Sequence, residues 1–287
     1  MHPILFEIPT PWGQQPIYAY GVLLGLSLLV GWQVTLLLGK QVEISAAEAS
    51  DAYLTTALAG LVGARALYLL TNRDEFTSFA QCFDLRSGGL VAYGGFLGGF
   101  LGAFIHQRIK HASLLNLADC AAPAIAVGVF LTRIGCYLYG CDFGSRLSDS
   151  APEWLKRLGR FPQWPEHAQL RGSPAWLHHV DSYGLSREAA FSFPVHPTQL
   201  YEALLGLALA GLCLSVFQRR QFVGQVLLVL CISYGTARFL LEYLRDDPER
   251  GEAFGFSTSQ LISLCIVPMA AIAYSVLRKP TQFWRRS

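Results

Sequence analysis

Charged side chains are scarce in this chain: only 15% of its 287 residues are Asp, Glu, Lys or Arg, against roughly 25% in a typical soluble domain. The net charge at pH 7 is only +2 and the basic residues are scattered, so we expect no nucleic-acid partner. The sequence lacks internal repeats and low-complexity linkers, and no Lys or Arg precedes its first apolar run. We therefore expect one domain over residues 1–287, with no cleavable signal peptide.

Long apolar runs are the main feature of the sequence, in which 52% of the residues are hydrophobic. A helix needs about 20 apolar residues to cross a hydrocarbon core of about 30 Å. Seven such runs lie near residues 17–38, 52–71, 89–106, 113–135, 197–217, 222–244 and 256–277. The sequence therefore predicts an all-α polytopic membrane protein with about seven transmembrane helices.

Lys and Arg are distributed unequally between the two sets of short loops. One set carries nine of them, the other four: Lys40, Arg108, Lys110, Arg219, Arg220, Arg278, Lys279, Arg285 and Arg286 against Arg73, Arg86, Arg245 and Arg250. The richer side is expected to face the cytoplasm. The N-terminus is therefore predicted to lie outside and the C-terminus in the cytoplasm.

One long connection, residues 137–194, falls on the predicted outer (periplasmic) face as an insertion between the fourth and fifth spans. It contains Trp154, Trp164 and Trp176 among proline and basic residues. Trp at a membrane interface keeps its ring in the headgroup zone. We interpret the insertion either as an interfacial flap without chemistry or as a gate over a site that opens outward.

The third apolar run, "GGLVAYGGFLGGFLGAFIH", is rich in glycine. Gly94, Gly98 and Gly102 are spaced four residues apart and share one helix face. Small residues at this spacing allow helices to approach closely in lipid. We interpret these glycines as helix-packing residues, and Tyr93 as the polar exception.

Charged residues inside membrane spans are costly and often mark function; those singled out within the predicted spans are Arg65, Arg133, Glu202, Arg238 and Glu242. Tyr234, Arg238 and Glu242 are four residues apart and so share a helix face. An ion pair that merely neutralises Arg238 is one interpretation. It does not account for Arg133, which has no carboxylate within reach on its own helix.

The fifth span opens with "VHPTQLYE", in which His196, Gln199 and Glu202 follow one another at intervals of three. Helix capping and interhelical hydrogen bonds are a structural alternative for this stripe. By the predicted orientation, the outer half of the membrane also holds Arg133, Arg238, Glu242 and Tyr93. Two arginines at one depth suit an anion, and the guanidinium fork suits phosphate. The residues alone therefore predict a phospholipid-headgroup site facing outward.

Two cysteines, Cys136 and Cys141, lie in "RIGCYLYGCDFGS". With His178 and His179 they resemble a metal-ligand set only weakly, and we expect no metal. A disulfide between the two, or from either to Cys82, is compatible with an oxidising outer compartment. The remaining cysteines lie in predicted spans and are interpreted as packing residues: Cys120, Cys213, Cys231 and Cys265.

"RIGCYLYGCDFG" resembles the signature loop of the prolipoprotein diacylglyceryl transferases, G-R-x-G-N-F-x-N-x-E-x-x-G. Further blocks resemble the same family in the same order: "YAYG" at 18–21, "GLVAYGGFLGG" at 89–99, "VHPTQLYE" at 195–202 and "YGTARFLLEYLRDD" at 234–247. The resemblance implies seven transmembrane helices in the bacterial inner membrane, with an outward-facing site. The implied reaction needs no cofactor: it moves a diacylglyceryl group from phosphatidylglycerol to the lipobox cysteine of a prolipoprotein, with glycerol phosphate leaving.

The resemblance also assigns roles to residues. Arg133 and Arg238 match the arginines that bind the headgroup, with Tyr234 and Glu242 beside the second. Tyr20 matches a functional tyrosine on the first helix, and Gly144 the closing glycine of the signature. The chain departs from the family pattern at five positions: Thr132 for glycine, Cys136 and Tyr139 for asparagine, Cys141 for glutamate, and Tyr93 for histidine.

These assignments lead to a mechanistic hypothesis. Arg133 and Arg238 stabilise the charge that grows on the departing phosphate, while a base takes the proton of the acceptor thiol. Tyr93 is the expected base, with His196 and Glu202 in reserve. Two alternatives stay open: a transferase with another acceptor, in which Cys136 or Cys141 carries a covalent intermediate, and a non-catalytic phospholipid-binding or transport protein.

Overall fold

The computed structural model describes residues 3–10, 13–73, 89–110, 113–164, 172–247 and 251–278. The chain divides into two compact units, a large unit of residues 1–31 and 122–287 and a small unit of residues 32–121. The single domain over residues 1–287 stays a prediction.

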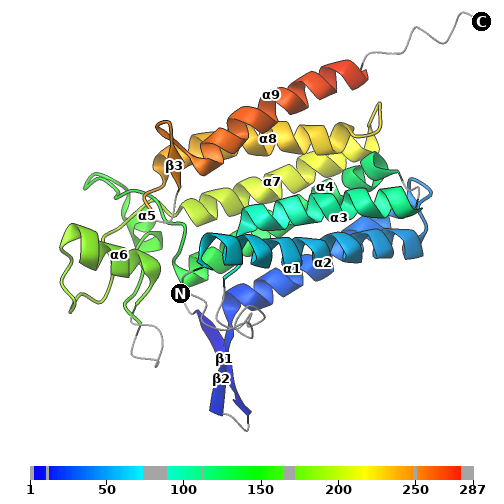
Figure 1. Ribbon diagram of the computed structural model, residues 1–287. Coiled ribbons are helices and arrows are strands. Elements are labelled where there is room, and N and C mark those ends of the chain that lie inside the picture. Colours follow the sequence, from blue (N-terminus) through cyan, green and yellow to red (C-terminus); the bar gives the residue numbers. More distant parts are fainter. Residues whose placement is uncertain are drawn as a thin grey trace, which may run out of the picture. The chain divides into compact units, whose positions relative to one another are not determined.

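Helices make up most of the described chain (Figure 1), and six of them are long and apolar enough to cross a membrane. The six are α1 (Ala19–Lys40), α2 (Ala46–Thr71), α4 (Leu114–Tyr139), α7 (Thr198–Gln218), α8 (Gln225–Leu241) with the 3₁₀ turn Glu242–Leu244 that extends it, and α9 (Thr258–Arg278). The third predicted run forms α3 (Ala92–Lys110), which has 19 residues but is not among the six. Its glycines and His106 add little or no hydrophobicity. The polytopic helical architecture is thus confirmed, and the count of seven spans stays a prediction.

Glycines allow α2 and α3 to pack closely in the small unit. A Cβ added to Gly63 would lie 2.3 Å from the carbonyl oxygen of Gly94, and one added to Gly98 would lie 2.3 Å from that of Ala59. At Gly102, the added Cβ would lie 2.5 Å from the Ala59 side chain. A side chain at any of these glycines would push the two backbones apart, which confirms their prediction as packing residues.

Arg65, a buried charge of the small unit, is also accounted for locally. Its Nη1 donates a hydrogen bond of 3.0 Å to the carbonyl oxygen of Gly89. Its guanidinium lies 5.5 Å from the centre of the Tyr68 ring. Arg65 therefore ties α2 to the segment that leads into α3.

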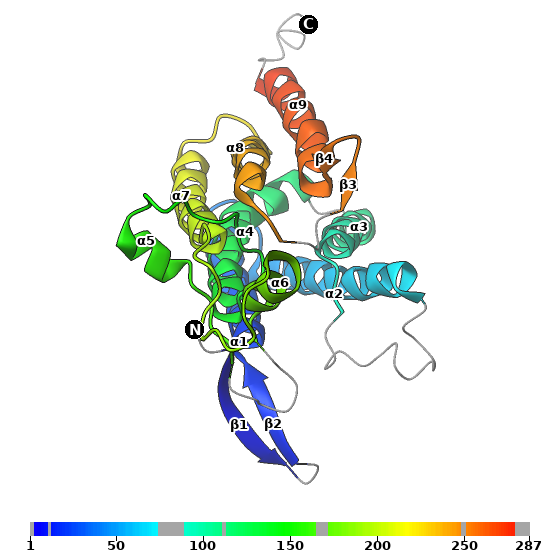
Figure 2. The same cartoon turned by 90° about the vertical axis from the view of Figure 1, so that its left-hand side faces the viewer.

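Helices α7, α8 and α9 lie side by side in the large unit (Figures 1 and 2). Close approach again depends on glycine. A Cβ at Gly206 would lie 2.8 Å from the backbone nitrogen of Phe130 on α4, and one at Gly235 would lie 2.7 Å from Val267 on α9. These contacts bring α4, α7 and α8 near enough for their polar side chains to meet.

Two short β-hairpins depart from a purely α-helical architecture. Strand β1 (Ile4–Thr10) pairs antiparallel with β2 (Gly13–Tyr18), directly before α1. Strands β3 (Glu252–Ala253) and β4 (Phe256–Ser257) form the second hairpin, before α9. The apolar periodicity of the spans gives no signal for either hairpin, because each is short and ends where an apolar run begins.

The insertion between α4 and α7 is a packed part of the large unit. It contains α5 (Glu153–Leu158) and α6 (Pro174–Tyr183), at the end of the bundle where α7 begins (Figure 1). Its core consists of Phe143, Phe161, Ala175 and Val195. The backbone N–H of Val195 donates to the carbonyl oxygen of Gly159 at 3.0 Å, which fixes the strand-like return to α7.

The tryptophans of the insertion differ in exposure. Trp164 and Trp176 are only 6% and 4% exposed, whereas Trp154 is 64% exposed. The indole N–H of Trp176 donates to the carbonyl oxygen of Ala189 at 2.8 Å. Two of the three rings are therefore buried within the protein, and the interpretation of the insertion as an interfacial flap or as a gate stays a prediction.

Candidate functional site

The C-terminal end of α4 brings two thiols together. Gly140 has a φ of +86°, and the N–H groups of Gly140 and Cys141 both donate to the carbonyl oxygen of Cys136, at 2.7 and 3.3 Å. A left-handed glycine after a helix commonly folds the chain back so that the flanking side chains touch. The sulfur atoms of Cys136 and Cys141 accordingly lie within 4.8 Å of each other.

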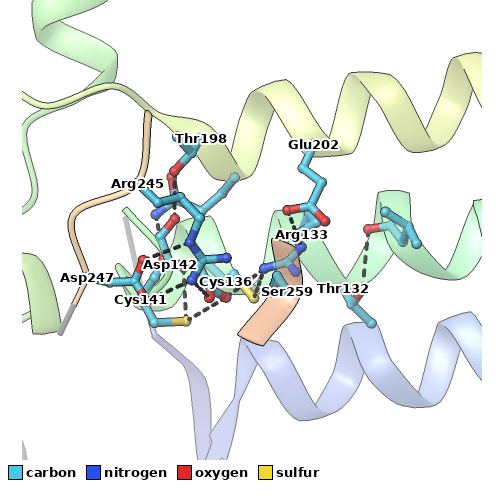
Figure 3. A network of polar contacts seen from close by, with 12 residues as sticks. Thr132, Arg133, Cys136, Cys141, Asp142, Thr198, Glu202, Arg245, Asp247 and Ser259 are labelled. Carbon is cyan, nitrogen blue, oxygen red and sulfur yellow. Dashed lines mark hydrogen bonds and ion pairs between the residues drawn. The ribbon is translucent and has the colours of Figure 1, made fainter. Parts of the chain in front are cut away.

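Arg133 lies in the last two turns of α4, and two carboxylates contact it (Figure 3). Its Nε is 3.0 Å from Oε2 of Glu202, and its Nη1 is 2.7 Å from Oδ2 of Asp142. Nη1 also points to the sulfur of Cys136 at 3.9 Å. Glu202 was expected from the sequence as a site residue, but Asp142 was not. Asp142 follows the helix in sequence and contacts Arg133 only because the chain turns at Gly140.

Glu202, on α7, joins the two predicted headgroup arginines. Its Oε2 contacts Arg133, and its Oε1 lies 3.9 Å from Nε of Arg238. The Tyr234 hydroxyl donates to the same Oε1 at 2.8 Å. The Glu202 side chain is only 4% exposed. The structure therefore brings Arg133 and Arg238 together around one buried carboxylate.

Arg238 is held by three different groups. Its Nη1 forms an ion pair with Oε2 of Glu242, one turn later. Its Nη2 donates to Oγ of Ser259 at 3.0 Å, and its Nε faces Glu202. The ion pair expected from the spacing of the two residues is therefore present, but it forms one part of a larger network.

A third arginine, Arg245, belongs to the same network and was not expected from the sequence. Its Nε and Nη2 each lie 2.7 Å from an oxygen of Asp247. Its Nη2 also donates to Oδ1 of Asp142. The signal in the sequence is the run "YLRDD", in which Arg245 is followed by two aspartates. Because this run follows a predicted span, Arg245 entered the sequence analysis only as a basic residue of a loop.

The charges of the network nearly cancel. Among the described residues it contains three guanidinium groups and four carboxylates, those of Asp142, Glu202, Glu242 and Asp247. The predicted headgroup site therefore combines its arginines with carboxylates. An anionic ligand must use an edge of an arginine that the carboxylates leave open. In the described part of the chain, Nη2 of Arg133 has no hydrogen-bond or ion-pair partner.

Asp142 stays ionised in this setting. Burial alone would raise the pKa of its carboxyl, but the guanidinium groups of Arg133 and Arg245 hold that pKa well below its usual range. The hydrogen bond with Cys136 and burial raise the pKa of the Cys141 thiol. The loop at neutral pH therefore combines a charged carboxylate with an uncharged Cys141 thiol.

Metal and disulfide chemistry can be weighed at the same place. The potential ligand atoms of Cys136, Cys141 and Asp142 all lie within 4.8 Å of one another. Because Arg133 and Arg245 already engage both oxygens of Asp142, their positive charge opposes a metal cation there. The six cysteines among the described residues are free thiols, and Cys82 lies outside the described residues.

Tyr20 and Gly144 have different relations to the network. A Cβ added to Gly135 would lie 3.0 Å from the ring of Tyr20, so this tyrosine packs beside the last turns of α4. A Cβ added to Gly144 would lie 2.6 Å from the carbonyl oxygen of Leu244 and 2.7 Å from His196. The geometry gives Gly144 a packing role, because three chain segments converge on it.

Three further residues that the sequence analysis named are His196, Tyr139 and Tyr93. His196 Nδ1 is 3.3 Å from the Tyr201 hydroxyl, and burial lowers the pKa of His196. The Tyr139 ring packs 5.7 Å from Trp164 of the insertion, measured between ring centres. Tyr93 lies in the small unit, in the first turn of α3. Its role as a base stays a prediction.

Comparison with known proteins identifies the family of this chain. The family model of prolipoprotein diacylglyceryl transferase matches residues 3–276. A phosphatidylglycerol–prolipoprotein diacylglyceryl transferase of Clostridium tetani is 26% identical over 281 residues, which cover 97% of this chain and 98% of the relative. The second enzyme of that name in Clostridium perfringens is 27% identical over 261 residues, 91% of each chain. A relative of the same name from Neisseria meningitidis is 27% identical over 266 residues, 87% of this chain and 89% of its own. The chain belongs to the prolipoprotein diacylglyceryl transferase family.

Proposed function

We propose that this protein transfers the diacylglyceryl group of phosphatidylglycerol to the lipobox cysteine of a prolipoprotein, and releases glycerol phosphate. The observation that carries the proposal is the convergence of Arg133 and Arg238 on Glu202, inside a chain whose family match runs from residue 3 to residue 276. In the reaction, a carbon–sulfur bond forms as the carbon–oxygen bond to the phosphate breaks. The thiol proton passes to a base, and the electron pair leaves with glycerol phosphate.

The arginines would act on the departing phosphate. Arg133 presents its Nη2 edge, while its other two nitrogens are fixed by Glu202 and Asp142. A preorganised donor of this kind stabilises a developing negative charge by about 3 kcal/mol. Arg238, whose three nitrogens are all engaged, would act mainly through its charge and by holding Glu202 in place.

Tyr93 is our candidate for the base, with His196 as the second candidate. Burial lowers the pKa of His196, so its imidazole is neutral at pH 7 and able to accept a proton. Glu202 is a weaker candidate than these two, because both of its oxygens already contact arginines or Tyr234 and are less available to take a proton. Loss of transfer in Tyr93→Phe, with lipid binding retained, is the expected result; an active Phe variant would move the role to His196.

The altered signature leaves the acceptor to be tested. Cys136 and Cys141 lie beside Arg133, but a thioether formed on either sulfur would be a poor leaving group for a second transfer. A covalent enzyme intermediate through these thiols is therefore disfavoured on chemical grounds. We propose that the two cysteines shape the site while an external cysteine accepts the lipid.

For the membrane arrangement we propose seven spans, with α3 as the seventh. Its 19 residues are long enough, and its glycines pack it against α2, which is itself a candidate span. The protein would then lie in the bacterial inner membrane with its N-terminus and the insertion on the periplasmic side and its C-terminus in the cytoplasm. Phosphatidylglycerol and a lipobox-bearing prolipoprotein would both reach the site from that side.

The test uses the purified full chain in detergent with phosphatidylglycerol and a lipobox peptide. Peptide mass and glycerol phosphate release are followed together. Arg238→Ala and Arg133→Lys are the site variants, and the exposed Arg157→Ala is the matched control. We expect a diacylglyceryl mass shift on the peptide cysteine that is lost in the site variants and kept in Arg157→Ala.

Two other outcomes would redirect the assignment. Glycerol phosphate release without a peptide adduct would indicate the same lipid donor with another acceptor. Saturable lipid binding with neither product would indicate a non-catalytic phospholipid-binding or transport protein.

A further inference from the structure

The signature loop has lost its acidic residue at one position and carries one at the next. Cys141 stands where the family pattern has glutamate, and Asp142 follows it directly. The Cys141 thiol lies 3.9 Å from the carbonyl oxygen of Cys136 and 3.8 Å from Oδ2 of Asp142. Position 141 therefore brings no carboxylate to the arginines, and Asp142 is the loop's only carboxylate in the network among the described residues.

Asp142 contacts two arginines from different elements (Figure 3). Its Oδ2 lies 2.7 Å from Nη1 of Arg133 on α4, and its Oδ1 accepts from Nη2 of Arg245 after α8. The Arg245 side chain is 6% exposed and that of Asp142 27%. Charge-assisted bonds of this kind are stronger and shorter than those between neutral groups. Asp142 thus ties the loop to both arginines at once.

The start of α7 fixes the backbone that carries this carboxylate. Asp142 has a φ of +57°, a left-handed conformation that Asp tolerates better than most residues. Its carbonyl oxygen accepts from the Thr198 hydroxyl at 2.6 Å, and that of Cys141 accepts from the Gln199 side-chain amide at 2.5 Å. The direction of the Asp142 side chain is therefore set from outside the loop.

The consequence for Arg133 is geometric. Its guanidinium is planar, with nitrogens in a fixed fork, so contacts at two nitrogens leave it one orientation. Glu202 holds Nε and Asp142 holds Nη1. Without Asp142, the group could turn about the Glu202 contact and would no longer present Nη2 in a fixed direction.

We propose that Asp142 is a positioning residue, which sets the orientation of Arg133 toward the phosphate and supplies from position 142 the carboxylate missing at position 141. This inference rests on the proposed function only for the identity of the ligand, a phosphatidylglycerol headgroup. Asp142 does not itself touch the phosphate. It acts through Arg133.

The test measures transfer kinetics in mixed micelles, with phosphatidylglycerol and the lipobox peptide varied separately. Asp142→Asn removes the charge and keeps the shape. The double variant Cys141→Glu, Asp142→Asn returns the carboxylate to position 141. Asp149→Asn, an exposed change on the same connection, is the matched control. Phosphatidylglycerol binding to each variant is followed independently by the shift in melting temperature.

For Asp142→Asn we expect the KM for phosphatidylglycerol to rise at least about tenfold, the size that loss of one charge-assisted contact gives. The KM for the peptide should stay within about twofold of wild type. The double variant should recover most of the lipid KM, and Asp149→Asn should match wild type. A structural role alone would instead lower the melting temperature and change both KM values together.

An Asp142→Asn enzyme with a wild-type lipid KM would overturn the positioning role. If the double variant is as impaired as Asp142→Asn, the carboxylate at position 142 does not replace the one missing at position 141. If the wild-type protein binds phosphatidylglycerol but never transfers it, the proposed function fails, and the binding shifts of the same variants still decide the role of Asp142.

Discussion

At the scale of single residues, Glu202 links the two helices that carry the predicted headgroup arginines. One buried carboxylate faces Arg133, Arg238 and the Tyr234 hydroxyl, which come from two other helices. A buried charge pair is weak support for stability as a whole, but removing one partner leaves the other charge uncompensated.

Glu202→Gln should therefore impair both stability and activity. The amide keeps the shape but leaves two buried guanidinium groups without their shared anion, a loss of about 3 kcal/mol. We expect a fall in transfer rate of at least about 100-fold and a lower melting temperature in detergent. Glu153→Gln, whose side chain is 56% exposed in a 4.0 Å surface ion pair, is the matched control. Wild-type rates in Glu202→Gln would show that Glu202 does not organise the arginines.

His179 makes the insertion sensitive to pH. Burial and then the nearby His178 and Arg146 lower the pKa of His179 to about 4, below the ordinary value of about 6.5. As the pH falls below about 6.5, His179 binds a proton in the unfolded protein but not in the folded protein. Stability is therefore lost between pH 6.5 and pH 4, by about 2 kcal/mol between pH 7 and pH 5.

Melting temperatures in detergent between pH 7.5 and pH 4.5 test this dependence. The wild-type protein should melt at progressively lower temperature below pH 6.5, and His179→Gln should reduce the slope because it removes the titrating group. His178→Gln, which leaves His179 in place, should keep most of the slope. Equal slopes for wild type and His179→Gln would contradict the argument.

At the scale of elements, the contact between α2 and α3 rests on glycines whose surroundings differ sharply. A Cβ at Gly98 would meet the Ala59 carbonyl oxygen at 2.3 Å, whereas one at Gly95 would meet its nearest neighbour at 3.7 Å. Backbone atoms cannot move aside as a flexible side chain can. Gly98 therefore cannot accept a methyl group, whereas Gly95, three residues earlier, can.

Gly98→Ala should destabilise the helix pair by about 1–3 kcal/mol, the cost of overpacking. Gly95→Ala is the matched control, because both changes bring the same gain in helix propensity. Thermal unfolding of the two purified variants in detergent makes the comparison. If Gly98→Ala melts no lower than Gly95→Ala, the close approach of α2 and α3 is not as described.

At the scale of the whole molecule, the number of spans decides on which sides the termini lie. Six candidate spans are long and apolar enough among the described helices, and α3 would be the seventh. An even number places both termini on one side of the membrane, and an odd number places them on opposite sides. The unequal Lys and Arg content of the loops favours a cytoplasmic C-terminus.

Reporter fusions to each end of the full chain test this topology. A fluorescent protein that matures only in the cytoplasm should be bright at the C-terminus and dark at the N-terminus. An enzyme reporter that is active only outside should give the reverse pattern. The same result at both ends would favour six spans and remove α3 from the membrane-crossing set.

Much of this protein follows from the sequence alone. The apolar runs predict seven spans, and six of them form helices that are long and apolar enough to cross a membrane, because crossing a hydrocarbon core is a local requirement of length and composition. The spacing of Arg238 and Glu242 predicts their ion pair, because residues four apart meet on any helix. The glycine spacing in α3 predicts close packing for the same local reason.

Other features depend on contacts between segments far apart in the chain. Arg245 and Asp142 are separated by 103 residues, and their contact requires both the turn at Gly140 and the close return of the chain after α8. Trp164 and Trp176 are buried in the insertion, which no periodicity of the sequence predicts. Composition and spacing determined that the chain has helices able to cross a membrane, and they pointed to Arg133 and Arg238 as candidate site residues. Only the tertiary structure decided how those arginines are oriented, because orientation depends on partners that distant segments supply.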